Sequence, residues 1–195
     1  MAKAKKLASK KDDPYKVFFN SMVSASVKGL EVLTKAQVTR ARKIPRKDIK
    51  NVYGPWRALV MMANEDSGLI LKVFYREIEF KNLLPPRLLT LSGEKLEIAV
   101  KDLAREYANQ TIGIVRNFMQ NSGDVRASIP IITRGFDEIW YPKTNAARDV
   151  EDAWQIEFVG GSIMCKLNGV DLSEDFYARF ASIDVTDYSG GIEFL

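Results

Sequence analysis

The sequence predicts an α+β fold in which two long helices pack on a mostly antiparallel sheet. Two pairs of apolar runs, each joined by a short glycine-containing turn, have the pattern of β-hairpins. Two long segments, 14–33 and 93–120, carry apolar residues at helical spacing. The order along the chain is helix, strands, helix, strands, which is typical of this class.

The first half begins with a basic tail over residues 1–13, which is expected to be disordered. The first long helix follows, with Asp12 or Asp13 as its N-cap and Pro14 in its first turn. The later elements of this half are a possible strand over 37–43, a hairpin of WRALVMMA (56–63) and LILKVFY (69–75) around the turn NEDSG, and a short helix over 76–84.

The second half contains the long helix 93–120, with Ser92 as its expected cap. A strand over 127–133 is interrupted by Pro130, which indicates an edge or bulged strand. The remaining elements are an expected loop over 137–153, a hairpin of 154–159 and 162–167 around Gly160-Gly161, and a short helix capped by Ser173. Residues 14–195 are therefore expected to form one domain.

The amino-acid composition excludes several classes of enzyme and metal site. The chain of 195 residues contains no histidine, which excludes Ser-His-Asp and Cys-His hydrolysis and every histidine-ligated metal site. Cys165 is the only cysteine and lies in an apolar strand, so it is interpreted as a core residue. No apolar stretch is long enough to span a membrane, and no apolar segment follows the basic start. We therefore expect a cytoplasmic protein.

Charge is distributed unevenly. Residues 1–11 hold five lysines and no acid, and without them the chain has 24 basic and 25 acidic residues. A second basic run covers residues 35–50, whereas the part from Glu151 onward is acidic. Nucleic-acid binding by the basic run is one interpretation. The run lacks interleaved aromatic residues, however, so we favour a solvated tail and a charged strand at a sheet edge.

The polar face of the helix 93–120 is unusual. On the face opposite its apolar residues lie six residues: Asp102, Arg105, Glu106, Asn109, Gly113 and Arg116. Glu106 and Asn109 are three residues apart and therefore neighbours. Asn and Gly each cost roughly 0.5–1 kcal/mol relative to Ala inside a helix, and Gly113 leaves clearance for another surface. An acid–amide pair that docks into a partner is one interpretation, and an ordinary polar face is the other.

At these residues the sequence resembles the CheC/CheX phosphatase family of bacterial chemotaxis. The family pattern is an Asp or Ser, three residues, Glu, two residues, Asn, and about twenty residues later a Pro. Here Asp102, Glu106, Asn109 and Pro130 occupy these positions, with a slightly shorter last gap. The order of the surrounding elements matches as well, over about residues 14–167, and leaves 168–195 as an extension.

The resemblance implies a CheC-like fold with pseudo-symmetric halves. Only the second long helix carries the motif, which is similar to the CheX type and implies a homodimer that extends a sheet across two chains. It implies hydrolysis of an aspartyl phosphate on a response-regulator receiver domain similar to CheY. The receiver supplies the Mg²⁺, so no metal or other cofactor of this chain's own is expected.

The resemblance also assigns roles. Asn109 would orient the attacking water and Glu106 would bind the receiver's active-site lysine, which makes these two the catalytic pair. Asp102 would support the helix or its rim, and Gly113 would give clearance. As a hypothesis from charge alone, Arg105 and Arg116 would contact acidic receiver surface.

Three alternatives stay open. The first is a CheX-like module that binds a receiver or another signalling partner without catalysis. The second is nucleic-acid binding through the tail and the basic run, and no membrane partner is expected. The third is an unrelated hydrolase site built from Glu, Asp and Asn.

Overall fold

The structure, a computed structural model, describes residues 13–119, 122–135, 150–180 and 191–193. The expected tail 1–13 therefore lies outside the described residues except for Asp13. Most of the expected loop 137–153 lies outside them as well, as does Asp12, the alternative N-cap.

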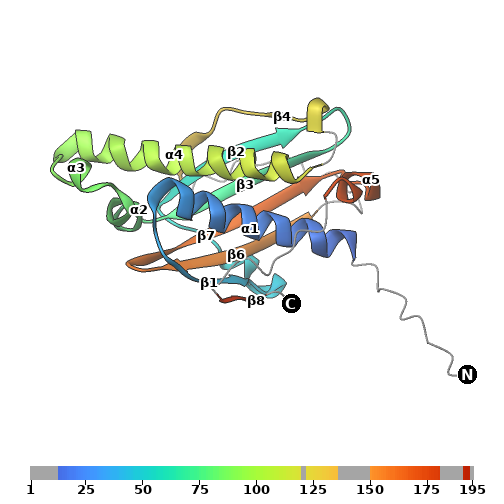
Figure 1. Ribbon diagram of the computed structural model, residues 1–195, viewed down its shortest axis with the longest axis horizontal. Helices are drawn as coiled ribbons and strands as arrows, with labels where there is room; N and C mark the ends of the chain where they lie inside the picture. Colours follow the sequence, from blue (N-terminus) through green and yellow to red (C-terminus); the bar gives the residue numbers. More distant parts are fainter. Residues whose placement is uncertain (1–12, 120–121, 136–149, 181–190, 194–195) are drawn as a thin grey trace, which may run out of the picture.

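An eight-stranded sheet forms one layer of the molecule (Figure 1). Its order is β4-β2-β3-β7-β6-β1-β8, with β5 also pairing with β2, and every pair is antiparallel except β1 with β8. The strands are β1 (Val38–Lys43), β2 (Trp56–Ala63), β3 (Gly68–Tyr75), β4 (Arg126–Ala127), β5 (Ile131–Arg134), β6 (Val150–Phe158), β7 (Gly161–Val170) and β8 (Gly191–Glu193).

Two long helices, α1 (Pro14–Thr34) and α4 (Gly93–Phe118), lie side by side on one face of the sheet (Figure 1). The shorter helices are α2 (Glu77–Leu83), α3 (Pro86–Leu89), α5 (Glu174–Ala178) and two 3₁₀ helices, η1 (Arg46–Asn51) and η2 (Ser122–Asp124). The predicted α+β class is thus confirmed, with the antiparallel sheet and both packed helices.

The strand order has an approximate two-fold relation between the halves of the chain. The central pair is β3 with β7, flanked by β2 on one side and β6 on the other. Beyond them, β1 of the first half pairs with β6 of the second, and β5 of the second pairs with β2 of the first. Each half therefore gives one strand to the other half, with α1 and α4 as the corresponding helices.

Local sequence explains the start of α1 and the turns of the hairpins. The Asp13 carboxylate accepts a hydrogen bond from the Tyr15 amide at 3.1 Å, and Pro14 begins the helix, as predicted. In the first hairpin the Asn64 side chain accepts from the amides of Asp66 and Ser67. In the second, Gly160 has a φ of 100°, a conformation that favours glycine.

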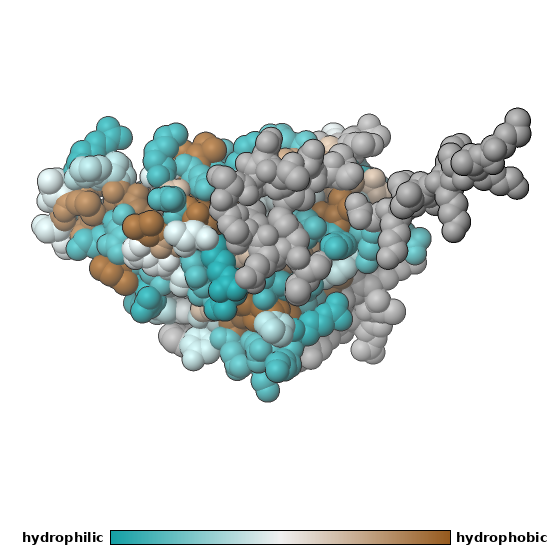
Figure 2. Space-filling view, turned by 60° about the horizontal axis from the view of Figure 1, so that its bottom comes forward, coloured by the Kyte–Doolittle hydropathy of each residue, from teal (hydrophilic) through white to brown (hydrophobic). Residues whose placement is uncertain are grey.

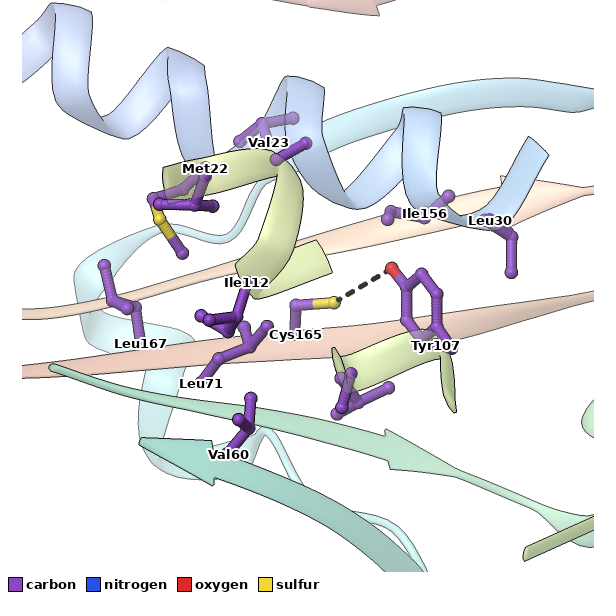
Figure 3. Packing of buried hydrophobic residues seen from close by; sticks show 14 of the residues in the cluster. Met22, Val23, Leu30, Val60, Leu71, Tyr107, Ile112, Ile156, Cys165 and Leu167 are labelled. Atoms are coloured by element: carbon purple, nitrogen blue, oxygen red, sulfur yellow. Dashed lines mark hydrogen bonds between the residues drawn. The ribbon is translucent and has the colours of Figure 1, made fainter. Parts of the chain in front are cut away.

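The main core lies between the helices and the sheet. Figure 3 shows Met22 and Leu30 of α1, Ile112 of α4 and Leu71 of β3 meeting around Cys165. Each large apolar side chain buried in this way stabilises the fold by about 1.5–3 kcal/mol. In α1 all seven residues from Ser21 to Val27 are buried, so this part of the helix is covered on every side.

The opposite face of the sheet carries a smaller apolar cluster. Ile49 and Val52, in and after η1, pack there against Phe74 and Ala153. In the coloured part of Figure 2, hydrophilic residues are interspersed with separate hydrophobic patches. Among the described residues, no helix has the length and apolar character that crossing a membrane requires.

An ionic cluster ties α1 to the sheet. Asp152 of β6 is fully buried, and its carboxylate lies 3.1 Å from the ammonium group of Lys43 on β1. The Tyr15 hydroxyl donates to the same carboxylate, and the pKa of Tyr15 is raised, first by burial and then by Asp152. Lys43 also lies 4.2 Å from the centre of the Phe19 ring. The buried charge is therefore paired.

Four predicted details need correction. Ser92 precedes α4, but its hydroxyl makes no capping bond, and the chain enters the helix through Gly93 with a φ of 58°. The helix ends at Phe118 instead of residue 120. Pro130 separates two short strands, where the sequence predicted one. Finally, β6 begins at Val150, so the last residues of the expected loop 137–153 are strand.

Candidate functional site

The six polar residues singled out from the sequence lie along the outer face of α4. Asp102, Glu106, Asn109 and Gly113 are exposed, and Arg105 and Arg116 are partly exposed. Steps of four, three, four and three residues lead from Asp102 through Glu106, Asn109 and Gly113 to Arg116. This spacing makes these five residues one continuous stripe, called the polar stripe below.

The opposite face of α4 fixes the polar stripe in place. Its buried residues include Val100, Ala104, Tyr107, Ala108 and Val115. They pack against α1 and the strands beneath, so α4 presents its outer face from a rigid support. A side chain on a packed helix is held more precisely than one on a loop.

The two long helices approach each other closely behind the motif. A Cβ atom added to Gly29 of α1 would come within 3.0 Å of the Thr111 hydroxyl oxygen on α4. Gly29 therefore permits close packing of the helices two residues away from Asn109 along α4. Glycine is unfavourable inside a helix, and at this position it serves as a packing residue.

Neither Glu106 nor Asn109 makes a side-chain hydrogen bond or ion pair with another described residue. Glu106 and Asn109 are about one helical turn apart, so both side chains extend into solvent from the same face of α4. Their donor and acceptor groups are available to a partner. A carboxylate accepts hydrogen bonds or pairs with a cation, whereas a carboxamide both donates and accepts without charge.

The two arginines of the outer face differ in their surroundings. Arg105 pairs with Asp102 one turn earlier on the same helix. Arg116 has no ion-pair partner among the described residues, and its Nε atom is buried without a hydrogen bond. The sequence grouped these residues together, and the structure separates them.

A shallow hollow of about 420 Å³ adjoins the C-terminal half of the polar stripe. Among the described residues, those that line it are Gln110, Gly113, Ile114, Arg116 and Asn117. A Cβ atom on Gly113 would meet no heavy atom within 4 Å, so the space above this residue is open. Gln110 and Asn117 were not singled out from the sequence, because polar residues near a helix surface carry no distinguishing signal.

A second group near the start of α4 was also missed. Two cationic groups lie over the indole of Trp56: the Lys101 ammonium group, 4.3 Å from the ring centre, and the Arg134 guanidinium, 3.9 Å from it. Glu97 pairs with Lys101 at 2.5 Å, which lowers the pKa of Glu97. The group joins α4 to β2 and β5 and is structural support near the motif.

The basic run 35–50 does not form one continuous cationic face. Lys43 turns inward to Asp152, and Arg42 donates to the side chain of Gln155 at 2.8 Å. The strand that carries this run, β1, was expected at the sheet edge, but β8 pairs with its outer side over Arg40–Arg42. Nucleic-acid binding therefore gains no support from this arrangement.

Cys165 is fully buried in β7, as the sequence indicated. Burial raises the pKa of its thiol to about 12. Such a thiol does not act as a nucleophile at neutral pH. In the part of the chain that the structure describes, no cluster of Cys, Asp and Glu has the arrangement of a metal site.

Comparisons with known proteins identify the fold. No protein-family model matches the chain, and no curated protein sequence matches it. A search of solved structures finds chemotaxis protein CheX from Vibrio vulnificus, with a TM-score of 0.59 and 15% identity over 78% of this chain and 99% of that one.

Two further structures agree. The CheC-like superfamily protein from Shewanella sp. PV-4 has a TM-score of 0.58 and 15% identity, covering 79% of this chain and 97% of that one. CheX in the CheX–CheY–BeF3–Mg²⁺ complex from Borrelia burgdorferi has a TM-score of 0.52 and 12% identity, covering 78% and 96%. The resemblance that the motif indicated is confirmed at the level of the fold, and the chain has the architecture of the CheC-like and CheX chemotaxis proteins.

Proposed function

We propose that this protein is a phosphatase that acts on the aspartyl phosphate of a response-regulator receiver domain, in the cytoplasm. The observation that carries the proposal is the exposed pair Glu106 and Asn109, free of partners among the described residues and mounted on a rigid helix. The fold adds support, because a CheX of the same architecture was crystallised with CheY, BeF3 and Mg²⁺.

In the proposed reaction, a water oxygen bonds to phosphorus as the bond from phosphorus to the receiver carboxylate breaks. The products are inorganic phosphate and the free carboxylate. The Asn109 carboxamide oxygen accepts a hydrogen bond from the attacking water and holds it in line with the leaving carboxylate. Such positioning can contribute several kcal/mol to a rate. The receiver would supply the Mg²⁺ that offsets the charge of the phosphoryl oxygens.

Glu106 has a docking role in this proposal. Its carboxylate lies one turn before Asn109 and would pair with the receiver's active-site lysine. The Asp102–Arg105 pair lies one further turn toward the helix start, which suits a rim contact better than a part in the chemistry. Gly113 leaves the receiver backbone room to approach.

A homodimer formed by sheet extension is also proposed, on the basis of the CheX-like single motif. The outer side of β1 is occupied by β8, so the opposite edge, formed by β4 and β5, is the better candidate for it. Light scattering on the purified chain measures the oligomeric state. A monomer at working concentration would contradict this part of the proposal.

The test of the catalytic proposal is phosphate release from acetyl-phosphate-charged receivers of the same organism. We expect wild-type protein to accelerate release from its cognate receiver and Asn109→Ala to abolish the acceleration while it retains binding. Glu31→Ala, a change on α1, is the matched control and is expected to behave as wild type. No acceleration across the panel would leave the alternative, a module that binds a receiver without catalysis.

A further inference from the structure

The charge of the polar stripe changes sign along α4. Asp102 and Glu106 are acidic, Asn109 and Gly113 are neutral, and Arg116 is basic. At the acidic end Asp102 is neutralised by Arg105, and Glu106 is left without a partner among the described residues. The stripe thus offers one unpaired anion and one unpaired cation on opposite sides of Asn109.

The surroundings of Arg116 favour the binding of an anion. Its Nε atom is buried without a partner within the described chain, which is costly for a charged donor. The hollow beside it is lined by two amide side chains and by the open surface of Gly113. Arg116 is one of the residues that line this hollow, and a guanidinium can bind a carboxylate through two parallel hydrogen bonds.

We infer that Arg116 and the hollow beside Gly113 bind an acidic side chain of the receiver, an inference that rests on the proposed function. Together with Glu106, this contact fixes the direction in which the receiver lies along α4. Seven residues separate Arg116 from Asn109, which corresponds to about 10 Å along the helix axis. The acidic side chain must therefore lie about that far from the phosphoryl group, on the side away from the receiver's lysine.

The test measures binding of receivers of the same organism charged with beryllofluoride and Mg²⁺, alongside phosphate release. Arg116→Glu is expected to weaken binding roughly tenfold or more, because it reverses the charge at the contact. Arg116→Lys keeps the charge but loses the paired hydrogen bonds, so an intermediate loss is expected. The receiver affinities of wild type and Arg116→Glu should become more similar as the salt concentration rises, because salt screens the charge interaction.

Lys50→Glu is the matched control, since it makes the same change in net charge in η1, on the opposite side of the sheet. Receiver binding should be unchanged in this variant. Thermal unfolding of all variants separates a loss of docking from a loss of folding, because Arg116 lies in the last turn of α4 and also interacts favourably with the helix dipole.

The outcomes are distinguishable. If wild type accelerates phosphate release and Arg116→Glu binds the receiver equally well, the inference is wrong and the proposed function stands. An equal loss in Lys50→Glu would also overturn the inference, because it would reveal an effect of net charge alone. If wild type neither binds nor accelerates any receiver, the proposed function and the inference are both wrong.

Discussion

The hydroxyl of Tyr107 donates a hydrogen bond to the backbone carbonyl of Ser26 at 3.1 Å and so joins α4 to α1 inside the core. Tyr107 lies between Glu106 and Asn109 in sequence and points the opposite way, toward Cys165 (Figure 3). The buried contact that anchors the helix and the exposed pair that would meet a receiver therefore lie on opposite sides of the same turn.

The Tyr107→Phe variant tests this division. It removes the buried hydrogen bond to Ser26 and the weak one to Cys165 but keeps the ring, so we expect the free energy of unfolding to fall by about 1 kcal/mol. Urea denaturation measures this as a lower midpoint with an unchanged slope. Phosphate release should stay at the wild-type rate. A strong loss of activity in a folded Tyr107→Phe protein would contradict the structural role.

Glu106→Ala tests the docking role. Glu106 is exposed and has no partner among the described residues, so stability should change little. If its carboxylate pairs with a receiver lysine, affinity for the charged receiver should fall by about ten- to a hundredfold, the value of a charge-assisted hydrogen bond. Titration with a beryllofluoride-charged receiver measures the affinity. Unchanged affinity together with a reduced maximal rate would assign Glu106 to the chemistry instead.

Gly113→Ala is expected to move stability and function in opposite directions. The added methyl group enters open space in mid-helix, so the free energy of unfolding should rise by about 0.5–1 kcal/mol. The same methyl group fills part of the clearance beside Asn109, so receiver binding should weaken, and more so in Gly113→Leu. Thermal unfolding and receiver titration are compared on the same preparations. Normal binding by Gly113→Leu would show that no surface approaches there.

The reactivity of the buried Cys165 thiol reports whether the protein is folded. Burial raises the pKa of its thiol to about 12, so the thiolate fraction at pH 8 is very small in the native state. In the unfolded chain the thiol ionises near pH 8.5. Between about pH 8.5 and pH 12 the native thiol is therefore protonated while the unfolded one is not, so the free energy of unfolding falls as the pH rises through this range. A thiol reagent should label the protein only as fast as it unfolds. Fast labelling of native protein at pH 8 would contradict this burial.

The helices and hairpins could be predicted because each has a strong local pattern. The second hairpin was predicted from two glycines between apolar runs, although its turn is Val159-Gly160 and Gly161 already pairs with Phe158 in the sheet. The start of α1 follows from Asp13 and Pro14. The spacing of apolar residues along α4 indicates most of its buried face, but not that Ile112 is buried. A helix with one neighbour buries one stripe, whereas α4 packs against both the sheet and α1.

Contacts between distant residues could not be predicted. The pairing of Lys43 with Asp152 depends on the register of β1 against β6, and no local pattern fixes that register. The difference between Arg105 and Arg116 was also invisible, because it depends on which nearby group each guanidinium meets. The polar stripe itself was predicted, since helical spacing places its members without any knowledge of the tertiary structure.

The enclosure of α1 has a consequence for stoichiometry. The approximate two-fold relation gives this helix the place that corresponds to α4, but the residues from Ser21 to Val27 are covered on every side. Its corresponding surface is thus closed to a second docking event. Under the proposed function each chain would engage one receiver at a time. When phosphorylated receiver is in excess, the rate of its dephosphorylation would then reach a maximum set by the number of these chains in the cell.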